Sequence, residues 1–298
     1  MKKIRVAIVG YGNVGQAAMQ AVLSSSDMEL VGIVRRNVQH IPHELKNCNV
    51  VGSIDALSDI DVALLCVPTR EVPRQAAALL EKGISTVDSY DIHTGICGLR
   101  NELMSIACEH GAVSIVSAGW DPGSDSVVRC LMNALTPSGI TYTDFGPGRS
   151  MGHTVAVRAI EGVEDALSLT IPLGTGLHRR MVYVQLKQGY DFEAIREQIL
   201  QDDYFRHDET HVQQVGSVAE LNNVAHSVNI VRNGVSGTTH NQQLAFRMSI
   251  NNPALTGQVM VSCARAAVRL QPGAYTMIEI PPVCLLPGDV EQNIRALV

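Results

Sequence analysis

Over the first 118 positions, short runs of apolar and mostly β-branched residues alternate with segments of helical periodicity. This alternation is typical of βαβ units, in which crossover helices join parallel strands. The apolar runs predict strands at Ile4–Val9, Leu30–Val34, Val62–Val67, Ser85–Val87 and Val113–Ser117. We therefore expect an α/β fold with a doubly wound parallel sheet, covered by helices on both faces.

The pattern changes after Gly119. Helical spacing over Ser124–Leu135 is followed by alternating apolar and polar residues, which predict antiparallel strands with one buried face. These strands are expected at Thr141–Phe145, Leu167–Ile171, Met181–Leu186 and Leu244–Ile250. The second part of the chain is therefore predicted to form a separate domain of the α+β class.

The C-terminal segment is predicted to return to the first sheet. Asn252 and Pro253 fit the cap and first turn of a helix that runs to about Leu270. Beyond it, Tyr275–Ile280 has the pattern of a strand. We expect one domain to comprise residues 1–118, completed by residues 254–298, and the other to comprise residues 119–253.

The composition restricts the class of protein. A chain of 298 residues, 46% hydrophobic and 17% charged, can form two modest cores. The first apolar run, Ile4–Val9, is too short for a signal peptide or a membrane span, which predicts a cytoplasmic protein. The 7 cysteines lack a CxxC or other ligand spacing, so we expect reduced thiols and no metal. A net charge of -6 without a long basic run favours small molecules over nucleic acid as partners.

A glycine-rich loop directly follows the first predicted strand. Gly10, Gly12 and Gly15 form the pattern GxGxxG, which between a strand and a helix binds the pyrophosphate of a dinucleotide. The first glycine permits the tight turn, the second lets the backbone approach the phosphates, and the third lets helix and strand pack closely. The alternative is a bare turn without a ligand. The flanking elements favour a Rossmann-like dinucleotide site.

The end of the second predicted strand indicates which dinucleotide binds. An acidic residue there would accept the ribose 2′-hydroxyl of NAD, but the chain has Arg35 and Arg36 at this point. A guanidinium binds phosphate with two parallel hydrogen bonds, so the pair favours the 2′-phosphate of NADP. The alternative is a solvated basic loop.

Two further segments at predicted strand ends carry side chains suited to a substrate. One is Asp88–Asp91 and the other is Gly119–Gly123, which holds Trp120, the one tryptophan of the chain. Carboxyl ends of strands in an open α/β sheet meet at the crevice that binds ligands. Aspartates from two loops would suit an ammonium group there, although Asp121 before a Pro-Gly pair also fits a plain turn.

At this point the chain resembles a known family. The segments VGYGNVG at 9–15, VDSYD at 87–91, SAGWDPG at 117–123 and FGPGRSMGH at 145–153 are similar in order and spacing to those of meso-diaminopimelate dehydrogenases. The resemblance extends from the N-terminus to the final helix and strand. In that family the enzyme uses NADP+ to remove the amino group at the D-configured carbon of meso-2,6-diaminopimelate, yielding L-2-amino-6-oxopimelate and ammonia. The reverse reaction is a reductive amination that feeds lysine and cell-wall synthesis.

The resemblance implies roles for individual residues. Asp91 and Asp121 would be the catalytic pair that holds the D-centre amino group near the nicotinamide. The pocket around that centre would be lined by Trp120, Phe145, Met151 and Gly152. The distal L-centre would be bound by Thr170, Arg180, His226 and Asn252. Arg180 would pair with the L-centre carboxylate.

For three of these residues the sequence alone leaves another interpretation open. The neighbour Arg179 could take the place of Arg180. His226 could be a core or strand-face histidine, and Asn252 fits a helix cap.

Contacts to the cofactor are predicted along the strand ends of the first domain. They are expected from Gly10, Tyr11, Gly12, Asn13, Val14, Arg35, Arg36, Cys66, Val67, Pro68, Thr69, Ser89, Tyr90, Asp91, Trp120, Asp121 and Pro122. The first domain would thus bind NADP, and the second would bind substrate and mediate dimerisation. A homodimer or higher homo-oligomer is implied by the resemblance.

The length of one segment distinguishes forms within the family. The stretch between Thr170 and Arg180 is short and resembles the form that accepts some 2-keto acids in the direction of D-amino acid formation. We therefore expect meso-diaminopimelate or related amino and keto acids as substrates.

Other classes of nucleotide-binding protein would carry different residues at these positions. Oxidoreductases of the glucose-fructose type carry Glu-Lys-Pro after the fifth strand, whereas this chain has no lysine within residues 87–91. The paired histidines and lysine of dihydrodipicolinate reductase also have no counterpart. A non-catalytic NADPH-sensing protein would keep the glycine loop but would not need the set Asp91, Trp120, Asp121 and Arg180.

Overall fold

The computed structural model describes residues 2–221 and 225–298. The chain divides into two compact units. The first unit comprises residues 1–130 and 252–298, and the second comprises residues 131–251. The helix α4 (Ser124–Leu135) contains the first boundary and has the bounds that the sequence predicts.

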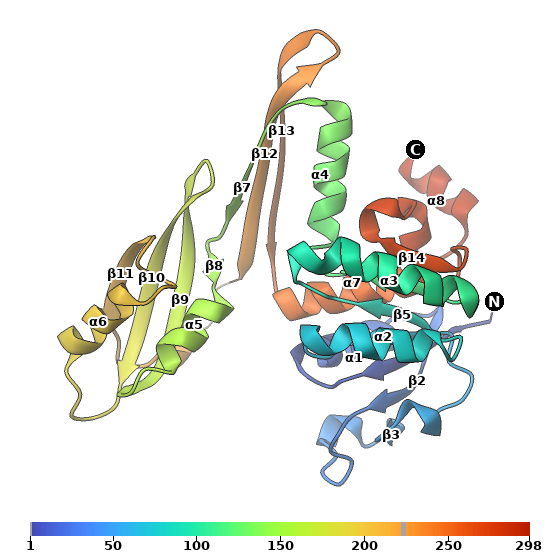
Figure 1. The fold of residues 1–298 in the computed structure, drawn as a ribbon, viewed down its shortest axis with the longest axis horizontal. Coiled ribbons are helices and arrows are strands. Elements are labelled where there is room, and N and C mark those ends of the chain that lie inside the picture. The colour runs from blue at the N-terminus through green and yellow to red at the C-terminus, as the bar shows by residue number, and fades with distance from the viewer. Residues whose placement is uncertain (1, 222–224) are drawn as a thin grey trace. The chain divides into compact units, whose positions relative to one another are not determined.

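The first unit is built on a seven-stranded sheet in which every neighbouring pair is parallel (Figure 1). Its spatial order is β14 (Gly273–Thr276), β6 (Val113–Val116), β5 (Ser85–Asp88), β4 (Val62–Leu65), β1 (Ile4–Val9), β2 (Met28–Val34) and β3 (Val50–Val51). Because all seven strands run in the same direction, the carboxyl ends of β1, β4, β5 and β6 lie along one edge of the sheet.

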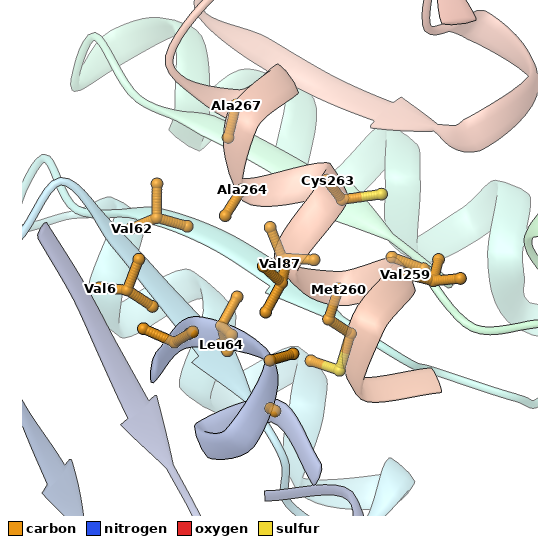
Figure 2. Packing of buried hydrophobic residues seen from close by; sticks show 14 of the residues in the cluster. Val6, Val62, Leu64, Val87, Val259, Met260, Cys263, Ala264 and Ala267 are labelled. Atoms are coloured by element: carbon orange, nitrogen blue, oxygen red, sulfur yellow. The ribbon is translucent and has the colours of Figure 1, made fainter. Parts of the chain in front are cut away.

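Helices cover both faces of this sheet. On one face lie α1 (Asn13–Leu23) and α7 (Asn252–Ala267), and on the other lie α2 (Val72–Leu80) and α3 (Ile96–Glu109). Successive residues of β4 alternate between the two cores, with Leu64 in one and Leu65 in the other, and both are fully buried. Figure 2 shows Leu64 and Val87 with residues of α7. Burial on both faces explains why the strands appear in the sequence as continuous apolar runs.

The contact between α1 and α7 depends on small residues. A side chain at Gly257 would place its Cβ 2.6 Å from the backbone nitrogen of Ala18. The two helices therefore approach each other more closely than larger residues would permit.

One predicted strand is wrong in part. Tyr275–Ile280 is extended only to Thr276, and Met277–Glu279 forms a turn of 3-10 helix. The carboxylate of Glu279 accepts hydrogen bonds from the backbone nitrogen of Thr276 at 2.8 Å and from its hydroxyl at 3.0 Å. This reciprocal cap ends the strand, and the chain closes with α8 (Val290–Leu297), which Asp289 caps.

The second unit contains two sheets. In the three-stranded sheet, β12 (His226–Ser236) pairs antiparallel with β7 (Ser138–Phe145) on one side and β13 (Thr239–Ile250) on the other. The four-stranded sheet has the order β11 (Glu209–Gln214), β10 (Leu177–Leu186), β9 (Val163–Gly174) and β8 (Gly148–Arg149), and its β10–β11 pair is parallel. The helices α5 (Met151–Arg158) and α6 (Phe192–Gln201) complete the unit.

The core of the second unit lies between the four-stranded sheet and its helices. Val182 and Val184 of β10 pack with Ile195 and Ile199 of α6 and with Phe205, and all are buried. The predicted fold class is confirmed: a Rossmann-like parallel sheet with a second unit of α+β structure. No helix within the described residues combines the length and the apolar character needed to cross a membrane.

Candidate functional site

The glycine loop at the end of β1 has the geometry that its pattern predicts. Gly10 adopts a φ of +98°, and a Cβ there would lie 2.3 Å from the carbonyl oxygen of Cys66. A Cβ at Gly15 would lie 2.3 Å from the carbonyl oxygen of Gly10. At Gly12, by contrast, a Cβ would meet no described atom within 4 Å. Two glycines thus let the chain pack on itself, and the third leaves the backbone open to a ligand.

The start of α1 offers donors at this opening. Gly12 occupies the cap position without a side-chain hydrogen bond, and the first turn contains no acidic residue. The first amide N–H groups of a helix lack partners within the helix, and they carry partial positive charge. Asn13 and Val14 therefore begin a helix that fits a phosphate.

Arg35 lies beside this loop at the end of β2. Its backbone nitrogen donates to Val51 at 2.9 Å, and its Nη1 is buried with no hydrogen-bond partner among the described residues. Burial and the negative charge of Glu44 raise the pKa of Tyr11, while the positive charge of Arg35 opposes the shift. Arg36 is exposed. A buried guanidinium nitrogen without a partner near the loop fits an anionic group of a nucleotide.

The segment after β4 contacts both the glycine loop and one of two loops that carry aspartates. We call these two the acidic loops: residues 88–91 after β5 and residues 117–123 after β6. The Cβ of Cys66 lies 3.4 Å from the Cβ position of Gly15, and Val67 lies 3.2 Å from that of Gly10. After Pro68, the hydroxyl of Thr69 accepts a hydrogen bond from the backbone nitrogen of Asp91 at 3.2 Å. This segment therefore lies between the nucleotide loop and the residues after β5.

Asp88 links the two acidic loops through hydrogen bonds. Its Oδ1 accepts hydrogen bonds from the backbone nitrogens of Tyr90 at 2.9 Å and Ser117 at 3.1 Å, and its carbonyl oxygen accepts one from Ala118 at 2.6 Å. Complete burial raises the pKa of Asp88 to about 6, although the two N–H donors oppose that shift. The Cβ of Ser89 lies 3.9 Å from the Cβ position of Gly119. The loops after β5 and β6 are therefore neighbours.

The two predicted catalytic aspartates lie on these neighbouring loops. The side chain of Asp91 is exposed, whereas that of Asp121 is 13% exposed. Asp121 accepts a hydrogen bond from Nη1 of Arg129 at 3.0 Å. The structure therefore places Asp91, the half-buried Trp120, Asp121 and the buried Pro122 in the same part of the first unit.

Sequence reasoning missed Asp125 and Arg129. Asp125 is fully buried, and its Oδ2 lies 3.9 Å from Nη2 of Arg129. Burial, followed by the negative charge of Asp121, raises the pKa of Asp125 to about 7, and Arg129 opposes the shift. A signal was present, because Asp125 and Arg129 are four residues apart and so share one face of α4, and Asp121 stands four residues before Asp125.

In the second unit, Thr170 and Arg180 face each other across β9 and β10. The guanidinium of Arg180 donates to the hydroxyl of Thr170, and its Nε donates to Asp208 at 2.6 Å. Arg179 instead pairs with Glu209 at 2.8 Å, on the opposite face of the strand. The face that carries Thr170 therefore holds Arg180 and not Arg179.

His226 begins β12 and lies close to β8. Gly148 pairs with Thr170, and a Cβ at Gly148 would lie 3.1 Å from the Cα of His226. Burial and then the charge of Arg149 lower the pKa of His226, which favours a neutral ring. The backbone of His226, in the three-stranded sheet, thus lies next to Gly148, the partner of Thr170 in the four-stranded sheet.

Two further residues border Arg180 and were missed by sequence reasoning. Asp208 forms its ion pair, and the positive charge of Arg180 adds to burial in lowering the pKa of His153. The Nδ1 of His153 lies 2.7 Å from the hydroxyl of Ser150, and its ring packs edge-on against Phe205. Neither residue has a distinctive spacing in the sequence.

The remaining predicted residues lie elsewhere or outside the description. Phe145 ends β7, and its backbone nitrogen donates to Nε2 of His178 at 3.2 Å. Asn252 begins α7 in the first unit and accepts a hydrogen bond from the hydroxyl of Thr256 at 3.2 Å. Met151 and Gly152 belong to α5, but their side-chain positions lie outside the described residues.

Comparison with known proteins agrees with this geometry. Residues 4–88 match the oxidoreductase family with an NAD-binding Rossmann fold, and residues 119–252 match the diaminopimelic acid dehydrogenase C-terminal domain. These two matches, together with the Rossmann sheet and its open glycine loop, place the chain among the nicotinamide-dependent oxidoreductases.

Full-length relatives identify the family. The chain is 58% identical to a meso-diaminopimelate D-dehydrogenase of Bacteroides fragilis over 100% of both chains. It therefore belongs to the meso-diaminopimelate D-dehydrogenase family, as the sequence motifs predict. The solved diaminopimelate dehydrogenase of Corynebacterium glutamicum in complex with diaminopimelate is 30% identical, with a TM-score of 0.84 over 100% of both chains. An engineered D-amino acid dehydrogenase bound to NADP+ is 29% identical, with a TM-score of 0.78 over 100% of both chains.

Proposed function

We propose that this protein oxidises meso-2,6-diaminopimelate at its D-centre with NADP+, yielding L-2-amino-6-oxopimelate and ammonia, and that it catalyses the reverse reductive amination. The observation that carries this proposal is the full-length similarity to a meso-diaminopimelate D-dehydrogenase at 58% identity. The site residues described above suit the charges of this substrate, which has two ammonium and two carboxylate groups.

NADP is the cofactor that the first unit fits best. The predicted contacts run from the glycine loop through Thr69 to the acidic loops, and the buried Nη1 of Arg35 lacks a partner among the described residues. A 2′-phosphate would supply that partner. When bound, NADP+ provides the oxidised nicotinamide ring that accepts the hydride of the D-centre.

The carboxylates of the first unit would bind the D-centre. Asp91 and Asp121 hold the ammonium group, and Trp120 with Phe145, Met151 and Gly152 lines the pocket. One carboxylate of the pair accepts the ammonium proton as the carbon–nitrogen double bond forms, and it then orients the water that hydrolyses the imine. Holding the reacting carbon in a fixed place supplies a large part of the rate enhancement.

A separate group of residues would bind the L-centre. Arg180 forms a two-point contact with the distal carboxylate, supported by Thr170, His226 and Asn252. Because the L-centre is fixed by these contacts, only the D-centre reaches the cofactor. Residues 1–118 with 254–298 thus serve the dinucleotide, and residues 119–253 serve the substrate and a homodimer or higher homo-oligomer of a cytoplasmic enzyme.

A tight hairpin supports the formation of D-amino acids from 2-keto acids as a second activity. β9 and β10 are joined through Thr175 and Gly176, with φ of +56° and +82°, so no longer loop extends from this end of the strands. Such a two-residue turn with positive φ at both positions matches the twist of the strands. A short connection leaves fewer side chains to restrict the distal end of the substrate.

The test is a cofactor-reduction assay. Protein, meso-diaminopimelate and NADP+ are mixed at alkaline pH, and absorbance of the reduced cofactor is followed. We expect turnover with the meso isomer, little with the LL isomer, and much less with NAD+. Turnover of a sugar or a simple D-amino acid, with none of meso-diaminopimelate, would favour the glucose-fructose class or another amino acid dehydrogenase. Absence of any turnover would favour a sensor.

A further inference from the structure

One guanidinium in the first unit faces two carboxyl groups. The Nη1 of Arg129 donates to Oδ1 of Asp121 at 3.0 Å, and its Nη2 lies 3.9 Å from Oδ2 of Asp125. Asp125 and Arg129 stand one turn apart on α4, and Asp121 precedes that helix. With a single positive charge, Arg129 cannot neutralise both carboxylates at once.

The two carboxyl groups have different surroundings. The side chain of Asp121 is 13% exposed and that of Asp125 is 0% exposed. Neither oxygen of Asp125 has a hydrogen-bond partner within residues 2–221 and 225–298. A buried carboxylate without hydrogen bonds is costly, so a proton on Asp125 stabilises this arrangement.

The charged groups that act on Asp125 are Asp121 and Arg129, the first raising its pKa and the second lowering it. Burial has the largest effect, and the pKa reaches about 7. Below pH 7 a protonated Asp125 therefore stands beside Arg129 and the carboxyl group of Asp121.

We propose that Arg129 changes partner when substrate binds: the substrate ammonium replaces it on Asp121, and the guanidinium turns to Asp125, which releases its proton to solvent. This inference rests on the proposed function, because it takes Asp121 as a ligand of the substrate ammonium. Asp125 is then a positioning residue that acts through Arg129 and touches neither substrate nor cofactor.

Charge balance supports the exchange. After it, the ammonium is paired with Asp121 and Arg129 is paired with ionised Asp125, so each of the two cations again faces one carboxylate. The one covalent bond that breaks is the O–H bond of Asp125, and its proton leaves as a cation. If Asp125 kept that proton, Arg129 would no longer face an ionised carboxylate of this cluster in a largely buried site, which is unfavourable.

The geometry requires little movement. A charge-assisted hydrogen bond spans about 2.7–2.9 Å, so Nη2 of Arg129 must approach Oδ2 of Asp125 by roughly 1 Å. Asp125 also lies in the first turn of α4, where the helix start favours an anion. The ionised form is therefore stabilised once the guanidinium arrives.

The experiment counts protons released on binding. meso-Diaminopimelate is titrated calorimetrically into the enzyme–NADPH complex, in which both reactants are reduced and no turnover occurs, in two buffers of different ionisation enthalpy. Near pH 6, about 1 below the pKa of Asp125, we expect release of close to one proton per substrate. Asp125→Asn and Arg129→Gln should each release about one proton fewer, because the exchange needs both groups.

A second measurement needs no variant. Substrate affinity of the wild-type chain should rise by up to about tenfold per pH unit below pH 7 and level off above it, whereas the Asp125→Asn affinity should lack this rise. Circular dichroism and NADPH binding verify that each variant folds. The matched control is Asp165→Asn, which removes a carboxylate paired with Arg158 in the second unit and should keep the wild-type proton count.

Equal proton release by the wild-type chain, Asp125→Asn and Arg129→Gln would overturn the exchange, as would a wild-type affinity that does not change between pH 6 and 7. If Asp125→Asn does not fold, Arg129→Gln and the wild-type pH dependence still decide. Failure of the proposed function gives a different result, because the wild-type chain would then neither bind nor oxidise meso-diaminopimelate.

Discussion

Arg35 is the residue on which we expect the choice between NADP and NAD to depend most directly. Its buried Nη1 has no partner among the described residues, while Arg36 beside it is exposed. A lost charge-assisted pair to a phosphate costs about 1.5–3 kcal/mol, or roughly 10- to 150-fold in affinity.

We therefore predict that Arg35→Ala raises the KM for NADP+ by about 10- to 100-fold and leaves the KM for NAD+ nearly unchanged. Initial rates with both cofactors measure the ratio. Arg36→Ala is the matched control and should have a smaller effect. Equal losses with NADP+ and NAD+ in Arg35→Ala would mean that this residue does not bind the 2′-phosphate.

The raised pKa of Asp88 predicts that the free energy of unfolding depends on pH. Its pKa is about 6 in the folded chain against 3.8 for the free group, so the folded state retains a proton that the unfolded chain loses. The stabilising effect of that proton is complete below pH 4 and is lost as pH rises through 6. The two pKa values differ by roughly 2 units, or about 3 kcal/mol.

Asp88→Asn tests this effect, because the amide oxygen can still accept from Tyr90 and Ser117. Denaturant unfolding at pH 4 and pH 8 gives the free energy of unfolding for both chains. Relative to the variant, the wild-type chain should lose about 3 kcal/mol between these values. A constant difference across that range would show that Asp88 is ionised in the folded state.

At the scale of elements, the packing of α1 on α7 makes a sharp prediction. A Cβ at Gly257 would lie 2.6 Å from a backbone atom of Ala18, whereas a Cβ at Gly98 in α3 would meet no described atom within 4 Å. Gly257→Ala should lower the free energy of unfolding by about 1–3 kcal/mol, and Gly98→Ala should raise it by about 0.5–1 kcal/mol. Thermal unfolding of both variants measures the two signs, and a stable Gly257→Ala would show that the helices can separate without cost.

The elements show what the sequence could and could not predict. β1 and α4 have the predicted bounds because their hydrophobic patterns are clear along the whole element. Their ends are marked by a glycine or by a change from helical spacing to alternating apolar and polar residues. The strand expected over Tyr275–Ile280 ends early, because Glu279 forms a side-chain cap that an apolar pattern does not reveal. Similarly, the roles of Asp125 and Arg129 depend on burial and on a contact to Asp121, whereas their spacing alone indicates a helix.

The sequence alone also does not decide between Arg179 and Arg180, because the choice depends on how β9 and β10 are paired. Two adjacent arginines are equivalent in the sequence, and only the pairing of β9 with β10 places Arg180 opposite Thr170. Asp208 reaches Arg180 from the turn before β11, a contact between residues 28 apart that no local pattern contains.

At the scale of the whole molecule, the proposed function assigns the two ends of the substrate to different residues. In that proposal, Asp91 and Asp121 bind the D-centre and Arg180 binds the L-centre. A short D-amino acid lacks the L-centre, so it separates the two contributions.

We predict that Arg180→Ala lowers kcat/KM for meso-diaminopimelate by at least about 100-fold but changes the slow turnover of a short D-amino acid by less than about threefold. Asp121→Asn should impair both substrates. Steady-state kinetics with NADP+ measure these ratios, with Arg179→Ala as the matched control. An equal loss on the short substrate in Arg180→Ala would show that this arginine does not serve the L-centre alone.

The enclosure of Cys66 has a practical consequence for chemical labelling. Although part of the residue reaches solvent, burial raises the pKa of its thiol to about 12, so it is almost entirely protonated at neutral pH and a poor nucleophile. Cys97, Cys108 and Cys130 are exposed. Maleimide dyes should therefore attach first at those three positions and leave Cys66, beneath Gly10, unlabelled, while the partly exposed Cys48 and Cys284 would react more slowly.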